Sequence, residues 1–189
     1  MKKNTIRLSR SIVGHREAEA VSRVIINDGY LGMGSEVRAF EEEIAQYLGV
    51  PMEWVVCVNS GTAALHLSVE AVTQPGDEVL VQSLTYLASF QGITAAGAVP
   101  ISCEVSSQNI AIELQDAKKR LTPTTKAIMP VHYASNPVEL DSVYDFANKY
   151  NLRVIEDAAH AFGCTYKGRK VGSFGDIVCF SFDGIKNIT

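Results

Sequence analysis

The chain has 189 residues, a formal net charge of −4 and 47% hydrophobic residues, enough apolar sequence for one domain with a sizeable core. Charged residues make up only 20% of it, so the composition excludes a disordered chain. The negative charge argues against nucleic acid or an anionic membrane as the main partner, although a helix N-terminus can still bind a phosphate group.

Residues 1–50 contain two amphipathic helical patterns, at 16–29 and 36–49, separated by a Gly-rich turn. They predict an N-terminal helical arm or packing segment. Residues 1–14 are basic but contain no apolar core of a signal peptide, so we expect a cytoplasmic protein. The second region, residues 51–189, is expected to form the main domain.

From residue 54 onward, apolar runs alternate with helical patterns. Strands are predicted at 54–58, 77–81, 98–105, 125–131, 152–156 and 176–182, helices at 60–72, 86–96, 112–121 and 138–150, and a hairpin at 164–172. Residues 79–103 carry no charge, but interruptions by Gln, Gly and Pro favour strand–helix–strand over a membrane span. The alternation predicts an α/β fold, a three-layer α/β/α sandwich with a mostly parallel sheet.

The four cysteines are far apart and form no C-x-x-C pair. Three of them lie in apolar runs, which favours buried thiols in a reducing compartment over disulfides or zinc. His132 and His160 could join Glu156 or Asp157 as metal ligands, but their spacing matches no zinc motif. We therefore expect no metal site.

Polar residues follow most of the predicted strands. Ligands of open α/β sheets bind beyond the carboxyl ends of the strands. The residues at those ends are Asn59, Ser60, Gly61, Thr62, Thr85, Tyr86, His132, Asp157, His160 and Ser181, and Lys186 follows five residues after Ser181. Taken singly, Ser60 and Asp157 could be helix caps, Tyr86 a packing residue and Lys186 a solvated lysine.

Taken together, these residues suit one cofactor, pyridoxal 5′-phosphate. Its aldehyde needs a lysine amine, and its phosphate suits a helix N-terminus. Its ring suits an aromatic face, and its pyridine nitrogen needs a carboxylate partner. The motif around Ser60 matches neither a dinucleotide fingerprint nor a P-loop, so neither a dinucleotide nor a nucleoside triphosphate is indicated.

The sequence resembles the DegT/DnrJ/EryC1/StrS family of sugar aminotransferases, which are fold-type I pyridoxal-phosphate enzymes of the aspartate aminotransferase superfamily. The resemblance rests on "NSGTAALHLSVEAV", "PGDEVLVQSLTYLAS", "TKAIMPVHYASNP", "RVIEDAAHAFG" and "FSFDGIKNIT". It implies that residues 51–189 form the cofactor-binding large domain.

The resemblance also implies a role for each candidate residue. Lys186 would form the Schiff base and move the proton, and Asp157 would pair with the pyridine nitrogen. The other positions implied to bind the cofactor are Ser60, Gly61, Thr62 and Ser181 at the phosphate, Tyr86 on the ring and His160 at the phenolic oxygen, where many relatives carry Gln. His132 would belong to the pocket wall.

The implied reaction moves an amino group from L-glutamate to a keto carbon of a nucleotide-activated deoxysugar. It would serve amino-sugar biosynthesis, for surface polysaccharide such as lipopolysaccharide or for an antibiotic. The implied assembly is a homodimer with its active site at the subunit interface. Two alternatives remain: a deoxysugar dehydratase, whose relatives carry His in place of the lysine, and a non-catalytic regulatory relative.

Three features depart from the family pattern. Ala134 stands where relatives usually carry Gly, so the loop after the fourth predicted strand is expected to differ. The turn "GMGSEV" lacks the usual Gly-Pro. The sequence ends soon after Lys186, so we expect a fragment that lacks the small C-terminal domain of the family.

Overall fold

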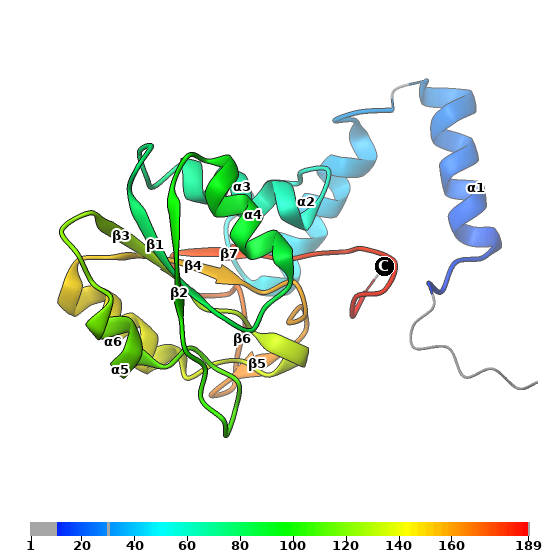
Figure 1. Ribbon diagram of the computed structural model, residues 1–189. Coiled ribbons are helices and arrows are strands. Elements are labelled where there is room, and N and C mark those ends of the chain that lie inside the picture. The colour runs from blue at the N-terminus through cyan, green and yellow to red at the C-terminus, as the bar shows by residue number, and fades with distance from the viewer. Residues whose placement is uncertain (1–10, 30, 189) are drawn as a thin grey trace, which may run out of the picture. The chain divides into compact units, whose positions relative to one another are not determined.

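The computed structural model describes residues 11–29 and 31–188. Residues 1–10 of the expected arm, Tyr30 of its Gly-rich turn and the terminal Thr189 lie outside the described residues. The chain forms two compact units (Figure 1): one combines Met1–Cys57 with Asp183–Thr189, and the other is Val58–Phe182. The division at residue 50 expected from the sequence stays a prediction.

The larger unit contains a five-stranded sheet in which every strand is parallel to its neighbours. The strands are β1 (Glu78–Gln82), β2 (Val99–Cys103), β3 (Thr125–Met129), β4 (Arg153–Asp157) and β7 (Ile177–Cys179), in the order β2-β1-β3-β4-β7. This confirms the predicted parallel sheet. Because the strands are parallel, their carboxyl ends lie along one edge.

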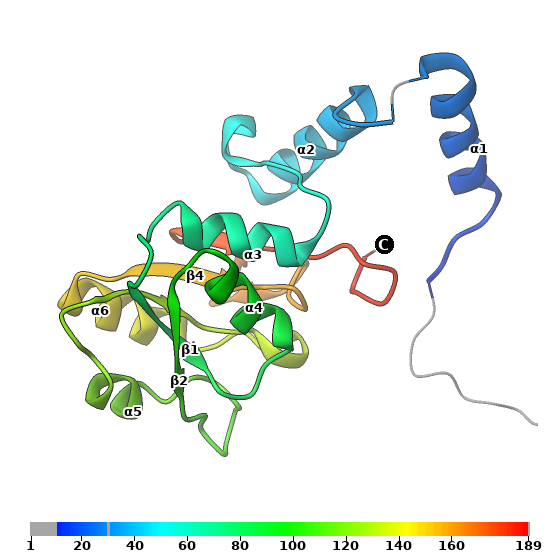
Figure 2. The same ribbon diagram turned by 45° about the horizontal axis from the view of Figure 1, so that its top comes forward.

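Helices cover both faces of this sheet, as Figure 1 and Figure 2 show. The helices α3 (Gly61–Glu70) and α4 (Leu87–Ala95) cover one face, and α5 (Leu114–Lys119) and α6 (Leu140–Tyr150) cover the other. The strand sequences dictate this, because successive side chains point to opposite faces. In β1, Val79 and Val81 pack with α3 and α4, whereas Leu80 packs with α5 and α6. The predicted three-layer sandwich is confirmed.

A two-stranded antiparallel hairpin precedes the last strand. It pairs β5 (Thr165–Tyr166) with β6 (Arg169–Lys170). The two residues between the strands, Lys167 and Gly168, have φ values of 48° and 77°. Positive φ at both central positions is typical of a type I′ turn, whose twist matches the strands it joins. The hairpin predicted at residues 164–172 is confirmed.

The strand predicted at residues 54–58 is wrong. Its first residue ends a 3₁₀ turn, η2 (Met52–Trp54), and the described residues pair no strand with the remainder. Val55 is extended, with φ −109° and ψ 123°, but the Cys57 N–H donates to the Glu41 carboxylate (2.8 Å) instead of to a neighbouring strand. An apolar run fits an extended connection as well as it fits a strand.

The smaller unit contains the two helices expected in the first fifty residues. The first is α1 (His15–Arg23), which continues as a π-turn, η1 (Val24–Asp28), and ends at Gly29 with φ 62°. The second is α2 (Ser35–Leu48), which buries Ile44, Ala45 and Leu48. Throughout residues 11–29 and 31–188, no helix has the length and apolar character required to cross a membrane.

An ion pair joins the start of β4 to the loop before β7. The Arg153 guanidinium donates two hydrogen bonds to the Asp176 carboxylate, at 2.6 and 2.5 Å, and the Val154 N–H donates a third at 3.1 Å. The Arg153 hydrogen bond holds the pKa of Asp176 below its ordinary value, against the opposing effect of burial.

This ion pair predicts a pH-dependent contribution to stability. A carboxyl group whose pKa is lowered by folding stabilises the folded state above its unfolded pKa, and that contribution is lost as the pH falls through the folded pKa. We expect Asp176→Asn to lower the free energy of unfolding by about 0.5–1 kcal/mol at neutral pH, since the pair is partly exposed. The difference from the unmodified protein, measured by urea denaturation, should shrink below about pH 4. A difference that is independent of pH would contradict the assignment.

Candidate active site

Asp157 is the last residue of β4, and its carboxylate is held from two sides. It is 4% exposed. Its Oδ2 accepts a hydrogen bond from the Ser89 hydroxyl at 2.7 Å, and its Oδ1 accepts one from the Ala159 N–H at 3.2 Å. Ser89 lies on α4 and is fully buried, and its Oγ is 2.7 Å from Thr85 Oγ1. The sheet edge and α4 therefore fix the orientation of this buried carboxylate.

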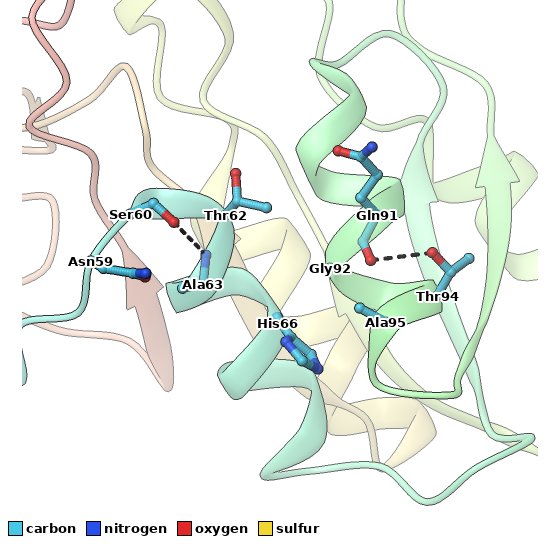
Figure 3. A pocket seen from close by; sticks show the side chains of 9 residues that line it. All are labelled: Asn59, Ser60, Thr62, Ala63, His66, Gln91, Gly92, Thr94 and Ala95. Atoms are coloured by element: carbon cyan, nitrogen blue, oxygen red, sulfur yellow. Dashed lines mark hydrogen bonds between the residues drawn. The ribbon is translucent and has the colours of Figure 1, made fainter.

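The N-terminus of α3 lies against the end of the last strand. Ser60 caps the helix by accepting a hydrogen bond from the Ala63 N–H at 3.1 Å, as Figure 3 shows. A side chain on Gly61 would place its Cβ 3.1 Å from Ser181 Cβ and 3.4 Å from the Phe180 carbonyl oxygen. Glycine at 61 therefore allows α3 and Ser181 to approach closely. The structure thus brings Ser60, Gly61 and Ser181 together at a helix N-terminus, the place in a fold that is best suited to an anion.

An open hollow of about 580 Å³ runs between α3 and α4 (Figure 3). It is lined by Asn59, Ser60, Thr62, Ala63, His66, Gln91, Gly92, Thr94 and Ala95. Its walls include two of the predicted phosphate-binding residues, but they do not include Asp157. The hollow therefore overlaps the candidate site at one end only, and the site is defined better by the buried groups at the strand ends.

Tyr86 and His160 come from the loops after β1 and β4. Tyr86 is the residue directly before α4, and it is 74% exposed. His160 Nδ1 accepts a hydrogen bond from the Ala134 N–H at 3.4 Å, and its ring meets that of Tyr133 edge-on, with centroids 6.1 Å apart. Because Nδ1 accepts, the proton of the neutral ring is on Nε2.

Ala134 has the left-handed backbone conformation, with φ 52° and ψ 40°, and Ser135 beside it has φ 63°. Glycine adopts this conformation without the steric cost that a Cβ brings, which is consistent with the glycine that the family pattern leads us to expect here. The Ser135 hydroxyl donates to the His160 carbonyl oxygen at 2.6 Å. The loop is thus tied to the segment after β4 even without glycine.

Glu156, the neighbour of Asp157, anchors a second buried network on the opposite face of β4. Its carboxylate is 2.7 Å from the Tyr144 hydroxyl and 2.8 Å from His132 Nε2, and Glu156 and His132 are both fully buried. His132 Nδ1 accepts a hydrogen bond from the Val138 N–H at 3.2 Å, so Nε2 carries the proton and donates to Glu156. Both ring nitrogens of His132 are engaged in this network, which makes His132 a core residue.

Two further features support this network. Burial, together with the charge of Glu156, raises the pKa of Tyr144 far above its ordinary value, so its hydroxyl remains a donor. Gly175 has φ 114°, and a Cβ there would lie 2.7 Å from both Glu156 Oε1 and the Tyr144 hydroxyl oxygen. Among the described residues, no group of three or more His, Cys, Asp or Glu side chains could hold a metal ion.

Lys186 lies in the smaller unit, five residues along the chain from Ser181. Its backbone N–H donates to the Asp183 carbonyl oxygen at 2.8 Å and closes a tight turn. Covalent connection alone keeps Lys186 within about 17 Å of Ser181, the reach of five extended residues.

Sequence reasoning missed Ser89 at the site, and it missed Tyr144 and Gly175 in the neighbouring buried network of Glu156. Only one signal was available for them. Ser89 lies four residues after Thr85, which directly precedes the N-cap residue of α4, and side chains at this spacing lie close at the start of a helix. The contacts of Tyr144 and Gly175 with Glu156 join distant parts of the chain, and no local sequence pattern predicts them.

Comparisons with known proteins agree with this architecture. Residues 12–189 match the DegT/DnrJ/EryC1/StrS aminotransferase family. The dTDP-4-dehydro-2,3,6-trideoxy-D-glucose 4-aminotransferase of Saccharopolyspora spinosa is 38% identical over 96% of this chain and 47% of its own length. The GDP-perosamine synthase of Caulobacter vibrioides is 43% identical over 83% of this chain and 42% of its own length.

The fold is also similar to that of solved structures. The PMP form of Spr1654 from Streptococcus pneumoniae matches with a TM-score of 0.91 and 30% identity, over 98% of this chain and 50% of that one. Its PLP form matches with a TM-score of 0.89. The chain spans about half the length of the relatives and structures that it matches.

Proposed function

Because the chain belongs to the DegT/DnrJ/EryC1/StrS aminotransferase family, which uses pyridoxal phosphate, we propose that this protein transfers an amino group to a keto carbon of a nucleotide-linked sugar. The observation that carries the proposal is the buried carboxylate of Asp157, held at the sheet edge by Ser89 and Ala159. A buried acid in this position suits a protonated ring nitrogen, and it has no role in binding a phosphate alone.

The residues present fit the cofactor at two of its ends. The close approach of Gly61 to Ser181 leaves a cradle that a Cβ would fill, at a helix N-terminus that suits a phosphate. Ser60, Gly61, Thr62 and Ser181 would hold that phosphate. Asp157 would accept a hydrogen bond from the ring nitrogen. When it is bound, the cofactor supplies an electron sink for a carbanion on the substrate.

Two further residues would orient the ring of the cofactor. Tyr86, which is largely exposed directly before α4, would stack on the ring. His160 would donate from Nε2 to the phenolic oxygen, since its Nδ1 already accepts the Ala134 N–H.

Lys186 would do the chemistry at the reacting carbon. Its amine would hold the cofactor covalently at rest. Once released, Lys186 Nζ would move a proton from the Cα of the amino donor to C4′ of the cofactor, and in the second half of the reaction it would move a proton from C4′ to the sugar carbon that receives the amine.

The substrate class follows from the relatives named above. Their names specify a dTDP-linked and a GDP-linked sugar, so we propose a nucleotide-linked keto-deoxysugar as the acceptor. We further propose L-glutamate as the donor, a homodimer with its site at the subunit interface, a cytoplasmic location and a role in amino-sugar biosynthesis. Lys186 argues against the dehydratase alternative, whose relatives carry His there.

Amino transfer can be tested directly. We expect purified protein, incubated with pyridoxal phosphate, glutamate labelled at its amino nitrogen and a panel of dTDP-, UDP- and GDP-linked keto-sugars, to produce one labelled amino-sugar. Mass spectrometry of the nucleotide-sugars would detect the label. Loss of a sugar oxygen without gain of nitrogen would indicate the dehydratase. Cofactor binding without conversion of any donor would indicate the regulatory alternative.

A further inference from the structure

We propose that the hydroxyl groups of Thr85 and Ser89 form a directed relay that positions Asp157 for the ring nitrogen of the cofactor. The inference rests on the proposed function and adds two residues to it. Thr85 Oγ1 and Ser89 Oγ are 2.7 Å apart, and Ser89 Oγ is 2.7 Å from Asp157 Oδ2. The three groups therefore form a continuous row of hydrogen bonds from the loop before α4, through α4, to the end of β4.

The relay has one direction. An ionised carboxylate only accepts hydrogen bonds, so Ser89 donates its single proton to Asp157. Once its proton is donated to Asp157, Ser89 Oγ can only accept a hydrogen bond from Thr85. The Thr85 hydroxyl is therefore the donor of that bond. A hydroxyl that accepts one hydrogen bond becomes a stronger donor in the next, because such chains polarise each other.

Burial increases the effect of losing any one of these hydrogen bonds. Ser89 is fully buried, Asp157 is 4% exposed and Thr85 is half-buried, so little water can replace a lost hydroxyl. The Ala159 N–H holds the other oxygen of the carboxylate, at 3.2 Å. The two donors together fix both the rotation of the carboxylate and the side from which it can accept a third partner.

Ser89 and Thr85 act through Asp157 and do not react themselves, so they are positioning residues. Their effect should depend on the ring nitrogen, whereas a role in packing alone should not. This distinction can be measured with a cofactor analogue in which C–H replaces the ring nitrogen and which keeps the aldehyde and the phosphate.

The experiment compares the dissociation constants of pyridoxal phosphate and of this analogue for the unmodified protein, Ser89→Ala and Thr85→Val. We expect Ser89→Ala to weaken pyridoxal phosphate binding by about 10- to 100-fold, the effect of one hydrogen bond to a charged group. Binding of the analogue should change by less than about 2-fold. Thr85→Val keeps the side-chain shape and should give a smaller loss, again for pyridoxal phosphate alone.

Thr73→Ala is the matched control, because Thr73 is also buried and its hydroxyl donates only to a helix carbonyl, that of Val69, at 2.8 Å. It should alter neither constant. Equal weakening of both ligands by Ser89→Ala and Thr85→Val, or no weakening of either, would overturn the relay while leaving the proposed function intact. If Ser89→Ala fails to fold, Thr85→Val decides. Failure of the unmodified protein to bind pyridoxal phosphate would overturn both proposals.

Discussion

Replacement of Lys186 by alanine is expected to abolish the absorbance of the Schiff base between lysine and cofactor and to lower the rate of amino transfer by at least about 10³-fold. The amine would serve first as the covalent attachment point and then as the base, and alanine removes both functions. Absorbance spectroscopy and the labelled-glutamate assay measure the two effects separately.

Two further variants test whether the effect is specific to a lysine amine at position 186. Lys186→Arg keeps a positive charge but places a permanently protonated group there, so it should be as inactive as Lys186→Ala. Lys126→Ala removes an exposed lysine on β3 and should leave both spectrum and rate unchanged. An unchanged spectrum in Lys186→Ala would show that another residue holds the cofactor.

Replacement of Gly175 by alanine is expected to lower the free energy of unfolding by about 3–5 kcal/mol, an effect large enough to threaten the fold. Two causes add. The backbone has φ 114°, which strains any residue with a Cβ, and the new Cβ would lie 2.7 Å from both Glu156 Oε1 and the Tyr144 hydroxyl oxygen. Relief of that contact must break a buried hydrogen bond to a charged group.

Gly168→Ala separates these two causes. Gly168 also has positive φ, at 77°, but a Cβ there would meet nothing within 4 Å. It should therefore show the backbone strain alone, about 1 kcal/mol. Urea denaturation of both variants measures the difference. Equal losses of stability would contradict the role given to the network of Glu156, Tyr144 and His132.

The parallel sheet and its covering helices were predictable, because their signals are local. Successive residues of β1 alternate between two buried faces, and helical patterns separate most of the successive strands. The hairpin was equally clear from Lys167 and Gly168. The strand predicted at residues 54–58 was wrong because a strand is defined by pairing with a neighbour. An apolar run in the sequence does not show whether such a neighbour exists.

The candidate site was predictable in part. The rule that ligands bind beyond the carboxyl ends of strands identified Asp157, and it put Ser60 and Ser181 on one edge, where the close approach of Gly61 brings them together. It could not distinguish Asp157 from Glu156 by chemistry. The structure separates them, since Asp157 accepts from Ser89 of α4 and Glu156 accepts from Tyr144 of α6.

His132 shows the limit of the same rule. It follows a strand end, as the site residues do, but its ring is turned into the core by Glu156 and by the Val138 N–H. Position along the chain fixes which edge a residue reaches, whereas its side-chain partners decide whether it faces a ligand. Those partners come from distant segments, which a single sequence does not reveal.

We propose that Lys186 holds pyridoxal phosphate beside the carboxylate of Asp157. Borohydride reduction of the protein with its cofactor, followed by mass spectrometry of the digested peptides, tests it directly, since hydride converts the carbon–nitrogen double bond between lysine and cofactor into a stable single bond. We expect the added cofactor mass on the peptide that contains Lys186, and on no other. Cofactor mass on a different lysine, or on none, would contradict it.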